Sequence, residues 1–200
     1  MFSQLTVAKR LALGFGLILS LMIAISLVGN HRVGFIDRTL TDVGDGAAVK
    51  QRYAINFRGS VHDRAIAIRD AVLVENDREL QRHLADIERL KGFYRDSAGP
   101  MDRMFREEGA NSRERELLAA IKEIQRRALT LTGDLLELRL AGEIDQARAF
   151  LLSDVSGAYS EWLKRVNAFI DYQEEVVTGG VDEVREAAST FNALNLAVTG

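Results

Sequence analysis

The sequence predicts an all-α fold: an antiparallel up-down-up-down four-helix bundle preceded by an N-terminal transmembrane helix. Three observations lead to this prediction. Residues 11–30 form an uncharged apolar run, apolar residues recur at steps of three and four through most of the remaining chain, and the 200 residues contain a single proline. Steps of three or four place apolar residues on one face of a helix, whereas a strand alternates at every second residue.

The composition describes an ordered chain of one domain. Hydrophobic residues make up 47% and charged residues 28%, which is too much apolar content for disorder. There is no cysteine, so disulfides, thiolate metal sites and thiol catalysis are excluded. A net charge of −3 argues against a general nucleic-acid-binding protein, and we expect no nucleic-acid partner.

Residues 1–10 and 11–30 are predicted to be a cytoplasmic tail and a transmembrane helix. Twenty uncharged residues at about 1.5 Å rise span the roughly 30 Å hydrocarbon core of a bilayer. Lys9 and Arg10, immediately before the run, favour a cytoplasmic N-terminus. A cleaved signal peptide is the alternative, with residues 24–26 as a small-x-small site, but the run exceeds the usual apolar region of roughly 7–15 residues. The bundle is then expected in the periplasm, anchored in the inner (plasma) membrane.

Four helices are predicted after this span, at about 33–73, 77–107, 112–140 and from 144 onward. Capping boxes that begin at Asn76 and Asn111 mark the starts of the second and third helices. Gly142 marks the break before the fourth helix, and Pro100 is expected to kink the second. Long helices joined by such short turns pack as an antiparallel bundle.

The helix lengths also predict where the bundle ends. The first helix runs for about 44 residues from the bilayer surface to its tip, so the fourth helix regains that surface near residue 190. No charged residue follows Glu186. We therefore expect the bundle to occupy residues 31–191 and a second transmembrane helix to begin at 192–200, in the front part of a longer chain.

An arginine-rich face of the first helix is the candidate binding feature. Arg58, His62 and Arg69 share one helical face, and Arg64 lies beside them on the apolar face. None of these arginines is expected to have an acidic neighbour on its own helix. A guanidinium half buried among alanines and isoleucines needs an anion, because an uncompensated buried charge is costly. That anion is either a carboxylate of another helix, such as Asp154, or one that a ligand brings.

The antiparallel register places hydroxyl groups opposite these arginines. Facing positions of the first and fourth helices are expected to sum to roughly 220, which sets Arg58 opposite Trp162 and the other two arginines opposite residues 151–156. Hydroxyls in this part of the fourth helix can bond to a carboxylate. The predicted ligand-binding residues are Arg58, His62, Arg64, Arg69, Ser153, Ser156 and Tyr159.

These features resemble the four-helix-bundle sensor domain of methyl-accepting chemotaxis receptors, whose best-known members are the bacterial aspartate and serine receptors. In the aspartate receptor the first helix carries the pattern R-x4-R-x3-R, which clamps the carboxylates of the ligand. Arg64 and Arg69 match the first two positions, and Leu73 departs from the pattern at the third. The resemblance implies a homodimer, a signal carried by displacement of the fourth helix, and cytoplasmic signalling partners, including a histidine kinase, reached through a C-terminal region.

The expected ligand is a small organic acid, because three arginines can neutralise two or three negative charges. Malate, succinate, citrate and aspartate are di- and tricarboxylates of this class. Two alternatives stay open: a membrane-anchored structural or partner-binding bundle without a small-molecule ligand, and the sensor domain of a histidine kinase. Enzymatic activity is not expected, since the three histidines lie far apart and neither a zinc-protease motif, a nucleophile elbow nor a phosphate loop is present. We expect no metal and no cofactor.

Overall fold

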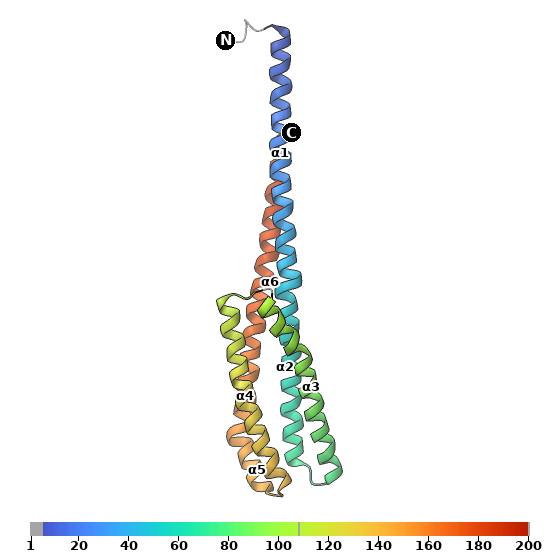
Figure 1. The fold of residues 1–200 in the computed structure, drawn as a ribbon, viewed down its shortest axis with the longest axis vertical. Helices are drawn as coiled ribbons and strands as arrows, with labels where there is room; N and C mark the ends of the chain where they lie inside the picture. Colours follow the sequence, from blue (N-terminus) through green and yellow to red (C-terminus); the bar gives the residue numbers. More distant parts are fainter. Residues whose placement is uncertain (1–5, 108, 200) are drawn as a thin grey trace. The chain divides into compact units, whose positions relative to one another are not determined.

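The structure, a computed structural model, describes residues 6–107 and 109–199. In these ranges every regular element is helical (Figure 1). The elements are α1 (Val7–Thr41), the π-helical turn η1 (Asp42–Ala47), α2 (Ala48–Leu73), α3 (Asp77–Glu107), α4 (Ser112–Leu140), α5 (Ile144–Phe150), the π-helical turn η2 (Leu151–Val155) and α6 (Ser156–Thr199). The predicted all-α four-helix bundle is confirmed.

The chain divides into two compact units, of which Gly46–Val176 holds the bundle. There α2 packs against α3, and α4 packs against α5 and η2. The Thr132 and Tyr159 hydroxyls lie 3.0 Å apart and tie α4 to α6. The turns at 74–76 and 141–143 reverse the chain at one end of the bundle, which gives the predicted up-down-up-down order.

The helix boundaries follow the sequence signals closely. α3 and α4 begin and end at the predicted residues, and α5 begins at Ile144 as predicted. The first helix differs from the prediction, because it starts before residue 33 and is unbroken from Val7 to Leu73 through η1. Both glycines of the η1 sequence DVGDGA weaken the regular helix, which is where a π-helical turn is easily accommodated. α3 continues through Pro100 to Glu107.

Large aromatic side chains fill the centre of the bundle unit. Phe57 of α2 stacks on Tyr94 of α3 with ring centroids 4.4 Å apart, and Tyr94 meets Trp162 of α6 edge-on at 5.4 Å. Each of these rings is at most 3% exposed. Complete burial of one large apolar side chain contributes about 1.5–3 kcal/mol, so this column of rings is a principal source of bundle stability.

Polar side chains form hydrogen bonds with unpaired backbone groups at the helix ends. The Asn111 carboxamide accepts the Glu114 N–H while the Glu114 carboxylate accepts the Asn111 N–H, both at 2.9 Å, so the predicted capping box at α4 is present. Arg139, in the last turn of α4, donates to the Ala71 and Val74 carbonyls at 2.9 Å. These carbonyls at the C-terminal end of α2 have no partner within their own helix, and the arginine supplies it.

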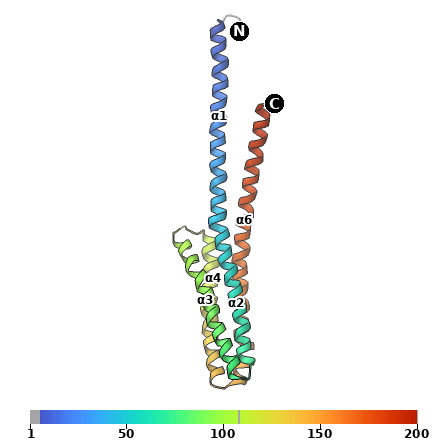
Figure 2. The ribbon, with the colours of Figure 1, turned by 90° about the vertical axis from the view of Figure 1, so that its right-hand side faces the viewer.

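The second unit pairs α1 with the last part of α6, and in Figure 2 the start of α1 and the end of α6 lie toward the same end of this unit. The helices approach closely at glycines. A Cβ on Gly29 would lie 3.7 Å from the Phe191 ring, and a Cβ on Gly180 would overlap the Val43 side chain. Because these glycines have no side chain, the two helices can pack closely at both positions.

One helix in the described residues is long and apolar enough to cross a membrane, and its apolar stretch lies in α1, where no side chain is buried. The transmembrane helix at 11–30 and the cytoplasmic tail at 1–10 stay predictions, and residues 1–5 of that tail lie outside the described residues. The second span at 192–200 also stays a prediction. The backbone is helical to Thr199 there, and residue 200 lies outside the described range.

Candidate functional site

A groove of about 280 Å³ opens between α2 and the segment formed by η2 and the start of α6. Its polar lining residues are His62, Arg69, Ser156, Tyr159 and Ser160. Its apolar lining residues are Ala65, Ile66, Ile68, Leu151, Leu152, Val155 and Leu163. Ligand pockets usually measure about 300–1,000 Å³, so this groove suits a small molecule.

The structure brings four of the seven predicted ligand-binding residues to this groove. His62 and Arg69 lie on its α2 wall, and Ser156 and Tyr159 lie on its α6 wall. Arg64 is buried in the core instead, at 1% exposure. Arg58 and Ser153 are exposed and do not line the groove. The Ser153 hydroxyl donates to the neighbouring Asp154 carboxylate.

Arg69 already has an anion on its own helix, so the expectation that it lacks an acidic neighbour is wrong. Its Nε and Nη2 atoms donate to one carboxylate oxygen of Asp70 at 3.2 and 3.1 Å. The expectation was based on residues one helical turn away, whereas the long Arg69 side chain bends back at the surface to the adjacent Asp70. The Nη1 end of the guanidinium remains available to a further acceptor.

His62 is held in a similar way. Its Nδ1 lies 3.2 Å from a carboxylate oxygen of Asp63, and both side chains are largely exposed. The ring carries positive charge only when it is protonated. As a neutral ring it still offers one donor and one acceptor to a ligand in the groove.

Arg64 lies between aromatic rings. Its guanidinium carbon is 5.1 Å from the Trp162 ring centroid and 5.7 Å from that of Tyr94. Within the described residues its Nε and Nη2 atoms have no hydrogen-bond partner. Burial lowers the pKa of Arg64, while Tyr159, Tyr94 and Glu88 oppose that change electrostatically. Cation–π contact partly replaces the lost hydration of the guanidinium.

The contact of Arg64 with Trp162 is not one of the predicted facing pairs. The sequence set Arg58, not Arg64, opposite Trp162. Helical side chains lean toward the N-terminus of their helix, so the long Arg64 side chain reaches back about one turn and meets the ring expected opposite Arg58. The groove is lined by residues 62–69 of α2 and residues 151–163 of η2 and α6, which fits facing positions that sum to roughly 220. The contact of Arg64 with Trp162 therefore depends on the length of the arginine side chain.

Tyr159 connects the groove to the buried arginine. It lines the groove, and its hydroxyl lies 3.0 Å from that of Thr132. Burial raises the pKa of Tyr159, while the hydrogen bond with Thr132 and the charge of Arg64 lower it. Arg64 thus interacts electrostatically with Tyr159 at the wall of the groove, although Arg64 itself does not line the groove.

Ser156 is positioned by η2. The π-helical turn directs both the backbone N–H and the side-chain hydroxyl of Ser156 to the Leu151 carbonyl, with the hydroxyl at 2.8 Å. The hydroxyl proton is therefore engaged, and the oxygen keeps its acceptor capacity. Such turns inside α-helices often lie at functional sites.

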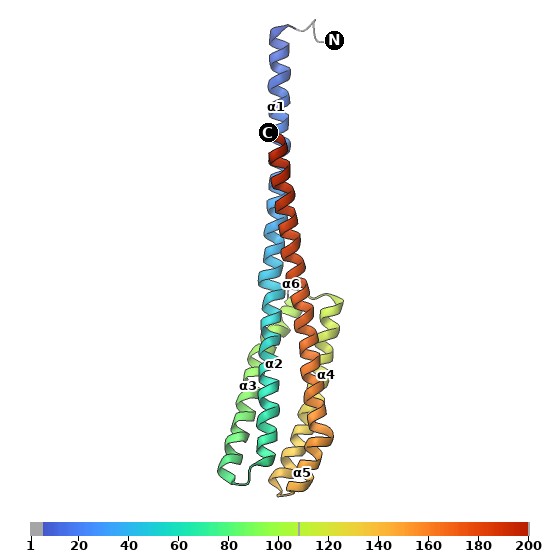
Figure 3. The same cartoon turned by 180° about the vertical axis from the view of Figure 1, so that it is seen from behind.

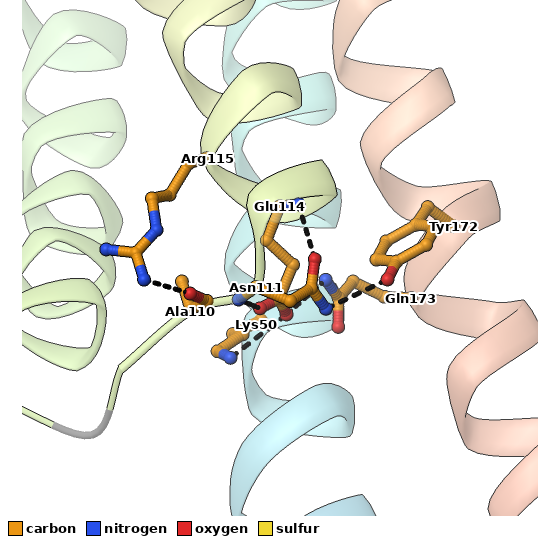
Figure 4. A network of polar contacts seen from close by, with 7 residues as sticks. All are labelled: Lys50, Ala110, Asn111, Glu114, Arg115, Tyr172 and Gln173. Atoms are coloured by element: carbon orange, nitrogen blue, oxygen red, sulfur yellow. Dashed lines mark hydrogen bonds and ion pairs between the residues drawn. The ribbon is translucent and has the colours of Figure 1, made fainter.

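A second polar cluster, defined here as the Glu114 cluster, joins α2, α4 and α6 (Figure 4). One carboxylate oxygen of Glu114 accepts Lys50 Nζ at 3.0 Å and Gln173 Nε2 at 2.9 Å. Lys50, Glu114 and Gln173 are 8%, 5% and 0% exposed. Nearby, the Asn111 carboxamide donates to the Tyr172 hydroxyl at 2.9 Å.

Hydrogen bonding decides the ionisation of Glu114. Burial alone raises its pKa, but the bonds from Gln173, the Asn111 backbone and Lys50, with the Lys50 charge, outweigh burial and hold the pKa below its usual value. Sequence reasoning identified Glu114 only as a capping residue. Its partners lie 64 and 59 positions away, and no local signal pointed to them.

Across the described residues, no three His, Cys, Asp or Glu side chains gather in a way that could hold a metal ion. A family model described as a four helix bundle sensory module for signal transduction matches residues 4–184. Comparison with curated proteins finds no significantly similar sequence.

Proposed function

Because the chain belongs to the family of four-helix-bundle sensory modules for signal transduction in chemoreceptors, we propose that it binds small organic acids in the groove between α2 and α6. A module of this family implies a membrane receptor with an extracytoplasmic domain that signals to cytoplasmic partners. For this chain we place the bundle in the periplasm and the anchor at residues 11–30 in the inner membrane.

The observation that carries the proposal is the distribution of polar groups across the groove. Arg69 and His62 line the groove on its α2 wall and can donate hydrogen bonds, and Ser156 and Tyr159 line it on its α6 wall. A guanidinium binds a carboxylate through charge-assisted hydrogen bonds, which are about twice as strong as neutral ones. A ligand carboxylate at Arg69 would therefore be held by one helix while the rest of the ligand contacts the other.

A ligand that bridges α2 and α6 can bias the position of α6. α6 is one continuous helix from Ser156 to Thr199 (Figure 3), and we propose that a displacement at its groove end is carried along this helix. The bias requires that the ligand binds one position of α6 better than another. Displacement of α6 is thus the proposed signal.

A homodimer completes the proposal, because sensory modules of this family typically act as dimers.

Calorimetric titration of the whole chain in detergent micelles tests the binding site. Arg69→Gln removes one charge-assisted partner and is expected to weaken organic-acid binding by about 1.5–3 kcal/mol, or roughly ten- to a hundred-fold. Arg58→Gln is the matched control, because Arg58 is an exposed arginine of the same helix outside the groove. Equal losses in both variants, or heat from no acid at all, would favour a structural or partner-binding bundle.

A further inference from the structure

The apolar character of the groove restricts the body of the ligand. Seven of its twelve lining residues are purely hydrocarbon, and they come from both walls. Leu152 and Ile66 are 77% and 37% exposed, so the groove offers apolar surface to solvent that a ligand would cover. Covering such surface is favourable in proportion to the apolar area removed from water.

The positive charge in the groove is sufficient for one carboxylate. Arg69 and His62 are the two lining residues that can carry positive charge, and each already lies within 3.2 Å of a carboxylate oxygen, from Asp70 and Asp63. Arg64 does not line the groove and is enclosed by rings. A second ligand carboxylate would have to lie against hydrocarbon, where an unpaired charge is costly, or near Asp70 and Asp63, where it is repelled.

We propose that the ligand is a monocarboxylate with a compact hydrocarbon body, either a short alkyl chain or a single ring. This inference rests on the proposed function and narrows the di- and tricarboxylates expected from the sequence. Arg69 holds the carboxylate at the α2 wall, and the hydrocarbon body fills the space between Ile66, Leu152 and Leu163. A volume of about 280 Å³ limits the body to this size.

Matched pairs of acids test the charge count directly. Succinate is butyrate with its terminal methyl group replaced by a second carboxylate, and adipate relates to hexanoate in the same way. Titrated into the whole chain in micelles at pH 7, butyrate and hexanoate are expected to bind at least about ten-fold more tightly than their dicarboxylate partners. Affinity should also rise about four-fold per methylene from acetate until the groove is full.

Leu152→Arg tests the location. This residue lines the groove at 77% exposure, so an arginine there adds a second cation without disturbing the core and should shift the preference toward succinate. Leu140→Arg is the control, because Leu140 is 59% exposed outside the groove. An unchanged preference in Leu152→Arg would overturn the assignment to this groove.

The outcomes separate this inference from the proposed function. Tighter binding of the dicarboxylates would overturn the monocarboxylate inference and leave an organic-acid sensor standing. Binding of neither series at millimolar concentration would overturn both. Tighter binding of the monocarboxylates that is lost in Arg69→Gln and retained in Arg58→Gln is the expected result.

Discussion

Replacement of Glu114 by glutamine is expected to destabilise the bundle by about 3 kcal/mol, the lower end of the range for breaking a buried ion pair. The change keeps the side-chain shape and removes the charge that Lys50 meets at 3.0 Å. Lys50 is 8% exposed, so its ammonium would be left without an anion in a nearly dry site. We use the lower end of that range because the Lys50 ammonium keeps a cation–π contact with Phe105, whose ring centre lies 5.5 Å away.

The same carboxylate gives stability a pH dependence of known sign. The pKa of Glu114 in the fold lies below its ordinary value of 4.5. A lowered folded-state pKa contributes stability that is present above the unfolded value and is lost as the pH falls through the folded value. The wild-type protein should therefore lose part of its stability below about pH 4.5, and Glu114→Gln should lack this component.

The single tryptophan makes the measurement simple. Trp162 is fully buried in the bundle core, so its fluorescence during urea unfolding in micelles reports on the bundle unit. Lys50→Met, Glu114→Gln and the double variant complete a cycle with the wild type. The double variant should be more stable than the sum of the single changes predicts, because it leaves neither charge unpaired.

Additive effects would refute this account. If each single variant changed the free energy of unfolding by less than about 0.5 kcal/mol, the pair would behave as an exposed one. Equal acid sensitivity of the wild type and Glu114→Gln would likewise remove Glu114 as the titrating group.

Three further predictions concern Arg64, Arg139 and Gly180. Arg64→Met should leave the free energy of unfolding in urea unchanged or raise it by up to about 4 kcal/mol, because two guanidinium nitrogens without partners are replaced by an apolar side chain; a loss above about 2 kcal/mol would contradict it. Arg139→Met should cost about 1–3 kcal/mol in the same assay, because it leaves two carbonyls at the end of α2 unbonded. Gly180→Ala should speed amide hydrogen exchange around residue 180 because its methyl group meets Val43, whereas Gly179→Ala, in open space, should slow exchange or leave it unchanged.

The fold was predictable because its signals are local. The capping box at Asn111, the glycine at 142 and the apolar steps of three and four each act within about one helical turn, and each specifies a boundary or a face. The sequence predicted separate helices at 11–30 and from about 33, whereas the structure has one unbroken helix from Val7. The change from apolar to polar composition near residue 30 indicated a boundary, but no residue there interrupts the helix.

The site was predictable in part for a geometric reason. Antiparallel packing with short turns fixes which segments of α2 and α6 meet, so the groove residues on both walls could be anticipated. The interaction partners of Arg64, Lys50 and Arg139 could not be anticipated from the sequence. These contacts depend on the reach of long side chains between positions far apart in sequence, and the aromatic environment of Arg64 looks like ordinary core in the sequence.

Within the bundle, hydrogen bonds hold α6 to α4 at two positions, and the proposed displacement of α6 must alter them. Near the groove, Tyr159 bonds to α4, and further along Gln173 and Tyr172 bond to Glu114 and Asn111. A hydrogen bond to a charged group contributes about 1.5–3 kcal/mol, while a ligand that binds one position of α6 ten-fold better supplies about 1.4 kcal/mol. The two quantities are of the same order. The Glu114 cluster is therefore expected to set how strongly a ligand must prefer one position before α6 moves.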